Sequence, residues 1–187
     1  MAWEMALRLP AQDGGAMKDH VDFVVAQWAE AMPSVDASSM EIFGRMARIQ
    51  KHLERLRAEA LAQYGFKEGE FDVLATLRRS GEPYRLTPTE LYRSLLVTSG
   101  AMTNRLARLE SAGMVERIVD PQDRRSVQVS LTVKGRALIE DAVGTHTEVQ
   151  NLVLAPLTLE QRQLLAGFLK TVMSSLPGEC APPNHHG

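Results

Sequence analysis

The stretch of sequence that decides the fold is TPTELYRSLLVTSGAMTNRLARLESAGMVERIVDPQDRRSVQVSL, residues 87–131. It begins with Thr87, Pro88 and Glu90, which supply an N-cap, a preset φ at the first helical position and the acceptor of a capping box. These residues predict a short helix that gives way to a tight turn and then to a second helix over about 99–112. Two short helices joined by so tight a turn indicate a helix-turn-helix.

Beyond the second helix the sequence changes to the two-residue alternation of β-strands, over 115–119 and 127–131. The segment between them, DPQDRR at 120–125, is polar and rich in turn formers, and it carries Arg124 and Arg125 at its end. We therefore expect a β-hairpin with two arginines at its tip. A hairpin placed directly after a helix-turn-helix predicts a winged helix-turn-helix module.

Helical patterns flank this module on both sides. Apolar residues over 42–60 and over 138–152 recur in alternating steps of four and three, which places a narrow apolar stripe along one face of each helix. Such stripes fit a dimer interface and fit an intramolecular bundle equally well. The predicted fold is therefore mainly α with a small β-hairpin wing, a winged helix-turn-helix plus a helical dimerisation region.

The 187 residues divide into five predicted parts. They are a flexible N-terminal extension at 1–17, an extra helix and a dimerisation helix within 18–64, the winged module at 65–131, C-terminal dimerisation helices at 132–176, and a flexible tail at 177–187. Cys180 is the only cysteine, so neither a disulfide framework nor a Cys-based zinc site is expected. This cysteine usage fits a reduced cytoplasmic protein. No apolar run approaches the roughly 18 residues of a membrane span, so we expect no membrane contact.

Charge is distributed unevenly along the chain, although the net charge is only −2. Residues 78–125 hold nine arginines against six acids, which makes that segment +3 and the remainder −5. A local basic region on an acidic body suits contact with a polyanion, because phosphate attraction acts over a Debye length and not over a whole chain. A solvated arginine-rich face remains the alternative on charge alone.

The sequence carries no signature of an enzyme, a cofactor site or a metal site. Its histidines are scattered, and no HExxH, P-loop or GxGxxG motif occurs. We therefore expect no enzymatic activity, no cofactor and no bound metal. The remaining rival to a DNA-binding module is a winged helix that contacts only proteins.

The helix expected over 99–112 has two distinct faces at about 100° per residue. Met102, Leu106 and Leu109 fall on one side and are expected to face the core of the module. The opposite side carries small or hydrogen-bonding residues, which a helix needs in order to approach base edges in a major groove. An ordinary solvated face is the alternative. The residues predicted to contact DNA are Thr98, Ser99, Gly100, Ala101, Thr103, Asn104, Arg105, Arg108, Asp123, Arg124 and Arg125.

These residues carry a resemblance to a known family. TSGAMTNRLARLESAGMVER, followed by DPQDRRSVQVSLTVKG, resembles the MarR family of winged-helix transcription regulators, and the resemblance covers roughly 39–176. It implies a homodimer in which the first and last family helices intertwine, with the helix over 99–112 in the major groove and Arg125 in the minor groove. It also implies a palindromic operator on double-stranded DNA, and repression that a small anionic or phenolic ligand relieves.

FDVLATLRRSGEPYRLTPTEL, preceded by VAQWAEAMP, is similar in particular to the urate-responsive, PecS-like branch of that family. The resemblance implies a pocket for urate, or for a phenolic or aromatic carboxylate ligand, formed by Trp28, Asp72, Arg105 and Arg117. An Asp72–Arg105 pair would tie the recognition helix to a carboxylate, and an anionic ligand beside Asp72 would repel it and shift that helix. The alternatives are a surface carboxylate at Asp72, a phosphate clamp at Arg105 and a core anchor at Trp28.

Overall fold

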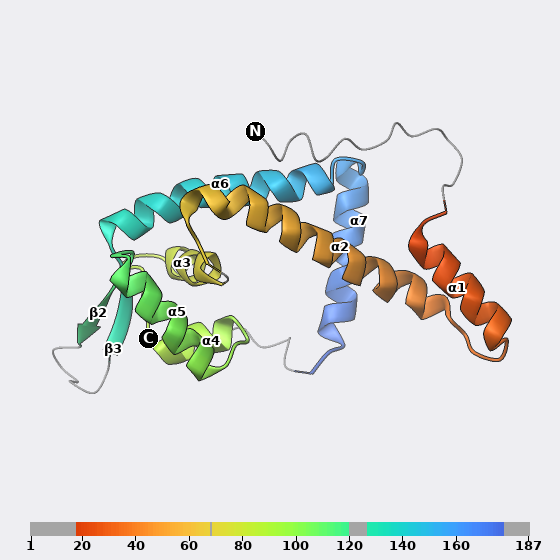
Figure 1. Ribbon diagram of the computed structural model, residues 1–187, viewed down its shortest axis with the longest axis horizontal. Helices are drawn as coiled ribbons and strands as arrows, with labels where there is room; N and C mark the ends of the chain where they lie inside the picture. Colours follow the sequence, from red (N-terminus) through yellow and green to blue (C-terminus); the bar gives the residue numbers. More distant parts are fainter. Residues whose placement is uncertain (1–17, 68, 120–126, 178–187) are drawn as a thin grey trace. The chain divides into compact units, whose positions relative to one another are not determined.

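A computed structural model of the chain describes residues 18–67, 69–119 and 127–177. Within these ranges the chain forms two compact units that divide between Ala60 and Leu61. The elements are α1 (His20–Ala31), α2 (Ser38–Leu61), the 3₁₀ turn η2 (Ala62–Tyr64), α3 (Glu70–Arg79), β1 (Arg85–Leu86), α4 (Pro88–Ser94), α5 (Ser99–Ser111), β2 (Val115–Val119), β3 (Val127–Leu131), α6 (Val133–Val153) and α7 (Leu159–Ser174) (Figure 1). None of the helices in the described ranges is both long enough and apolar enough to span a membrane.

The first unit holds α1 against α2 through a network of charges. Asp19 caps α1 because its side chain accepts the backbone N–H groups of Val21 and Asp22, and the side chain of Asp22 accepts the Asp19 N–H in return. Arg45 of α2 donates to both carboxylates, at 2.8 Å to Asp19 and 2.6 Å to Asp22. The hydrogen bond from the Asp22 backbone, followed by that from the Arg45 guanidinium, holds the pKa of the Asp19 carboxyl below its usual value.

The second unit has a core to which α3, α4, α5, α6 and the sheet all contribute. Its fully buried side chains include Leu74, Leu77, Leu91, Met102, Leu106, Leu109, Val129 and Ile139. In the sheet, β3 lies between β1 and β2, and both pairings are antiparallel. The two wing strands have their predicted bounds. Strand β1 was not predicted, because two residues are too few to show an alternation pattern.

One predicted helix ends earlier than expected. The dimerisation helix predicted within 18–64 ends at Leu61, short of residue 64, and the chain then tightens into the 3₁₀ geometry of η2. Gly65 then adopts a left-handed φ of 70°, which stops the helix because glycine carries no Cβ to oppose that conformation.

An aromatic row runs from η2 through α3 to α6. The ring centroids of Tyr64 and Phe66 are 5.8 Å apart, those of Phe66 and Phe71 are 6.0 Å apart, and those of Phe71 and His146 are 4.7 Å apart. The hydroxyl of Tyr64 also shares a hydrogen bond of 2.8 Å with that of Thr145. The segment that leads into α3 is therefore fixed to α6.

A cluster of charges joins the other end of α3 to α6. Glu140 accepts hydrogen bonds from Arg136 at 3.0 Å and from Arg78 at 2.7 Å. Both guanidiniums also lie over the ring of Tyr84, at 4.8 and 4.9 Å from its centroid. Hydrogen bonds from Arg136 and then from Arg78 hold the pKa of the Glu140 carboxyl below its usual value.

Thr132 joins the wing to α6 and to the turn that follows α5. Its hydroxyl oxygen accepts the N–H of Gly135 at 3.0 Å, which caps α6, and donates to the carbonyl oxygen of Gly113 at 2.8 Å. Its backbone N–H donates to the carbonyl oxygen of Met114 at 3.1 Å. Gly135 is buried against that same carbonyl, and a Cβ there would collide with the oxygen. The start of α6, the end of β3 and the turn after α5 are thus packed backbone to backbone.

Apolar side chains remain exposed on helices of both units. On α2 they include Ile42, Phe43, Met46 and Ile49, and on α7, where no residue is buried, they include Leu159, Leu164, Phe168 and Val172. The stripe predicted on α6 is used differently, since two of its members, Ala142 and Val149, are buried within the chain itself. Exposed apolar surface is therefore concentrated on α2 and α7, and less on α6.

Candidate nucleic-acid interface

Two capped helices place the candidate recognition helix. Thr87 caps α4 by accepting the N–H of Glu90 at 3.2 Å, while the Glu90 carboxylate accepts the Thr87 N–H at 2.7 Å, so the predicted capping box is present. Thr98 caps α5 by accepting the N–H of Ala101 at 3.2 Å. The inner face of α5 is buried through the three predicted residues Met102, Leu106 and Leu109. The opposite face of α5 is therefore turned away from the core.

That outward face of α5 is formed by small and polar side chains. Gly100, Thr103, Asn104, Ala107 and Ser111 are all exposed. A Cβ built on Gly100 would have no atom of the described residues within 4 Å, so no packing among those residues requires a glycine in this helical turn. Glycine lowers helix stability, and its presence here suits a surface that another molecule approaches closely.

The turn between α4 and α5 contains an unusual residue. Leu96 has a left-handed φ of 52° and is 84% exposed. Leucine is disfavoured in this conformation because its Cβ crowds the following carbonyl. The conformation is held by neighbouring backbone bonds, including one from the Val97 N–H to the carbonyl of Tyr92 at 3.2 Å.

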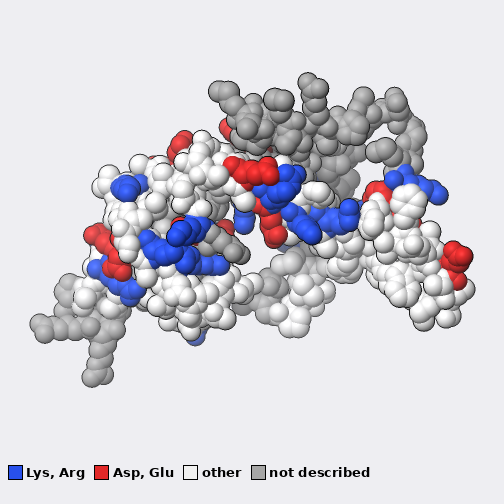
Figure 2. Space-filling view, viewed as in Figure 1, with Lys and Arg blue, Asp and Glu red and all other residues white. Residues whose placement is uncertain are grey.

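Two arginines of α5 extend to the first turn of α3. Arg108 donates from Nε to Oε1 of Glu70 at 2.6 Å, and Oε2 of Glu70 accepts the backbone N–H of Lys67 at 2.9 Å. Glu70 is only 5% exposed. The guanidinium of Arg105 occupies the space that a side chain on Gly69 would take, and Gly69 has a φ of 73°. Figure 2 shows basic side chains gathered over the region where α3 and α5 lie in Figure 1.

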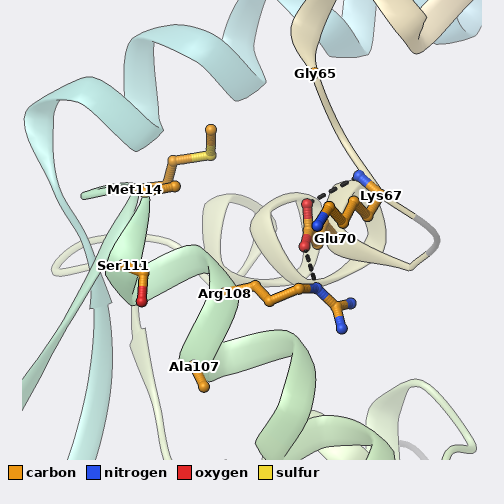
Figure 3. Close-up of a pocket in the computed structure, with 8 residues that line it drawn as sticks. Gly65, Lys67, Glu70, Ala107, Arg108, Ser111 and Met114 are labelled. Carbon is orange, nitrogen blue, oxygen red and sulfur yellow. Dashed lines mark hydrogen bonds and ion pairs between the residues drawn. The ribbon is translucent and has the colours of Figure 1, made fainter.

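A cavity of about 510 Å³ lies beside this contact (Figure 3). Its walls come from the segment before α3, from α3 itself and from the second half of α5 with the turn after it. The lining residues are Gly65, Lys67, Glu70, Ala107, Arg108, Ser111, Ala112 and Met114. Glu70 and Lys67 are absent from the predicted site, because the sequence gives no signal that Glu70 meets a residue 38 positions away.

The four residues of the predicted ligand pocket lie in both units. Trp28 belongs to α1 in the first unit and is 39% exposed. The other three belong to the second unit, where Asp72 is half-buried on α3 and Arg105 lies over Gly69. Arg117 on β2 donates from Nε to Glu110 of α5 at 3.0 Å. The pocket itself stays a prediction.

The wing is described only in its strands. Asp123, Arg124 and Arg125, predicted to contact DNA from the tip, lie outside the described residues, as do the predicted flexible extension at 1–17 and all but the first residue of the predicted tail at 177–187. Within the described ranges, no group of three or more His, Cys, Asp or Glu side chains is arranged to hold a metal ion.

Comparisons with known proteins agree on one family. The sequence profile of the MarR family matches residues 64–126. The chain is 35% identical to the HTH-type transcriptional regulator PecS of Dickeya dadantii (strain 3937), over 83% of this chain and 94% of that protein. It is 28% identical to the HTH-type transcriptional repressor YetL of Bacillus subtilis (strain 168), over 81% of this chain and 90% of that protein.

Solved structures give the same relationship. A mutant of MarR from E. coli complexed with operator DNA aligns with a TM-score of 0.62 and 30% identity, over 78% of this chain and 97% of that chain. The winged-helix architecture is therefore shared with a protein whose structure contains operator DNA.

Proposed function

The chain belongs to the MarR family of DNA-binding transcriptional regulators, and from this premise we propose that it is a homodimeric repressor that binds a palindromic operator. We further propose that a small anionic or phenolic ligand releases it from that operator. The observation that carries the first proposal is the outward face of α5, where exposed Gly100, Asn104 and Ala107 form a narrow surface of small and polar side chains.

Each residue type on that face has a specific use in a major groove. The side-chain amide of Asn104 is suited to adenine, because its donor and acceptor match N7 and the N6 amino group. Gly100 and Ala107 permit close approach of the helix to base edges. The N-terminus of α5, capped at Thr98, favours a nearby phosphate through its exposed N–H groups. The arginines at the wing tip are proposed to enter the adjacent minor groove, whose negative potential attracts them.

The exposed apolar helices support the proposal of a homodimer. Phe43 on α2 is 58% exposed and Phe168 on α7 is 67% exposed, each among other exposed apolar residues of its helix. Contiguous exposed apolar surface is unfavourable in water and is typical of an interface. Two subunits related by a two-fold axis would read a palindrome, because the symmetry of the protein is mirrored in the half-sites.

The proposal of a ligand depends on the arginines beside α3 and on the similarity to PecS. Arg105 lies against the first turn of α3, one helical turn from Asp72, so an anion bound there would act directly on a side chain of the recognition helix. Urate, a phenol or an aromatic carboxylate has the required charge or polarity. A regulator of the same fold without a small-molecule ligand is the second candidate function.

The DNA-binding proposal is tested with duplexes that the full-length protein selects from a randomised pool. We expect the selected sites to be palindromic and the gel shift to weaken steeply with salt, because each phosphate contact releases counterions. Selected sites without two-fold symmetry would contradict the dimeric operator. Failure to select any sequence would favour a winged helix that contacts proteins.

The ligand proposal is tested on the selected duplex with urate, phenol and benzoate at millimolar concentration. At least one of them is expected to release the DNA from the wild type and to lose this effect in Arg105→Gln or Arg117→Gln. Arg85→Gln is the control, since Arg85 is an exposed arginine on β1 outside the proposed pocket. If none of the three compounds releases the duplex, the regulator without a ligand is the better description.

A further inference from the structure

Glu70 and Lys67 adjoin Arg108 at the edge of the outward face of α5, and neither belongs to the predicted DNA-binding set. We propose that these three residues form a site for one backbone phosphate of the operator, in which Arg108 and Lys67 contact the phosphate and Glu70 orients Arg108. We refer to Lys67, Glu70 and Arg108 as the phosphate site. The inference rests on the proposed operator binding through α5 and adds a contact to it.

The bond between Glu70 and Arg108 leaves the end of the guanidinium available. It joins Oε1 of Glu70 to Nε of Arg108 at 2.6 Å, so the two Nη groups extend past the carboxylate (Figure 3). The other carboxylate oxygen accepts the Lys67 N–H at 2.9 Å. Both oxygens of Glu70 are therefore used within the protein, while the Nη groups can form the paired N–H···O bonds that arginine makes with phosphate.

The cavity beside these residues opens toward the surface that faces the groove. Ala107 and Ser111, which line it, are also exposed on the outward face of α5. Lys67 lies on the opposite side of the same cavity, in the segment before α3. A sugar-phosphate backbone that runs past the second half of α5 would meet two cations and a serine hydroxyl, beside the small side chain of Ala107. The local charge, two cations and one paired carboxylate, favours an anion.

Burial gives Glu70 a positioning role in this arrangement. The side chain of Glu70 is 7% exposed and that of Arg108 is 39% exposed, so the carboxylate fixes the arginine from the protein interior while the guanidinium reaches the surface. Binding DNA with a mobile arginine would require its side chain to lose rotamer freedom. An arginine already held by Glu70 has lost that freedom before DNA arrives.

If Glu70 positions Arg108, replacing Glu70 changes the affinity for DNA in the direction opposite to the one that its charge alone predicts. Glu70→Gln removes a negative charge close to DNA, and charge alone would therefore tighten binding. If Glu70 orients Arg108, the same substitution weakens binding, because the neutral amide holds the guanidinium less firmly. Glu116→Gln is the matched control: Glu116 is an exposed carboxylate on β2 of the same module, and its removal should tighten binding or leave it unchanged.

The experiment measures the anisotropy of a labelled duplex that the wild type has selected, over a range of salt concentrations. Glu70→Gln and Arg108→Gln are each expected to weaken binding about tenfold. The double variant should bind no more weakly than Arg108→Gln alone, since Glu70 acts through Arg108. The logarithm of the association constant falls linearly with the logarithm of the salt concentration, and Lys67→Gln should make that slope less steep by about 0.9 for each subunit. Thermal unfolding identifies the temperature at which every variant is folded, and binding is compared there.

Three results would overturn the phosphate site while leaving operator binding intact. They are tighter binding by Glu70→Gln, additive losses in the double variant, and an unchanged salt slope in Lys67→Gln. Failure of operator binding itself is distinguishable, because the wild type would then select no duplex.

Discussion

Replacing Gly100 with alanine is expected to stabilise the protein and weaken its binding to DNA at the same time. The added methyl group meets no atom within 4 Å in the part of the chain that the structure describes, so packing there contributes nothing to the change. The gain comes from helix propensity and amounts to about 0.5–1 kcal/mol. For a chain of this size that corresponds to a rise in Tm of about 1–4 °C.

The same methyl group stands on the surface proposed to approach the bases. An extra methyl group in a close contact costs about 1–3 kcal/mol, which corresponds to a loss of affinity of about 5-fold to 150-fold. Thermal unfolding measures the first effect, and anisotropy of the selected duplex measures the second. Gly144→Ala is the matched control, because Gly144 is also helical with open space at its Cβ position and lies on α6.

The control should gain stability without losing affinity for DNA. If Gly100→Ala binds the duplex as tightly as the wild type, the start of α5 does not approach the bases. If both glycine variants lose affinity equally, the loss comes from stiffening the helices and not from a contact on α5.

Three further predictions follow from local features. Leu96→Gly should raise the free energy of unfolding by about 1 kcal/mol, because glycine accepts the left-handed φ and the exposed leucine buries little; an unchanged urea midpoint would contradict this. Gly135→Ala should lower the free energy of unfolding by about 1–3 kcal/mol through overpacking. A urea midpoint equal to that of the wild type would refute the close backbone contact. The pKa of the Asp19 carboxyl is lower in the folded protein than its ordinary value of 3.8. The contribution of this carboxylate to the free energy of unfolding is therefore complete above pH 3.8 and is lost as the pH falls through the lower pKa of the folded state. In a Trp3→Phe background, Trp28 fluorescence should therefore show an acid transition that Asp19→Asn removes.

The elements of the winged module could be predicted because their signals are local. The capping box at Thr87 and Glu90 involves neighbours in the chain, and it appears in the structure with both hydrogen bonds. The wing strands follow from alternation over five residues each. Strand β1 has only two residues, and it exists because β3 offers it a partner. No pattern within two residues can indicate such a pairing.

The contact between Glu70 and Arg108 could not be predicted for a related reason. In the sequence, Glu70 is one more acid in the first turn of a helix, where acids are common because they complement the helix dipole. Its burial depends on how α3 packs against α5, which no local pattern shows. Asp72, two residues later, is the carboxylate that the family resemblance indicates. A buried partner for a recognition-helix arginine emerges only when the two helices are placed together.

The junction at Thr132 limits how a signal can reach the DNA. Because the hydroxyl and the backbone N–H of one residue join the wing, the turn after α5 and the start of α6, we expect these three elements to move together. In the proposed dimer, regulation would then change the separation of the two recognition helices, which must match half-sites about 34 Å apart. Paired spin labels should accordingly report a changed distance between the α5 helices of the two subunits on release. The distance from α5 to the start of α6 within one subunit should stay constant.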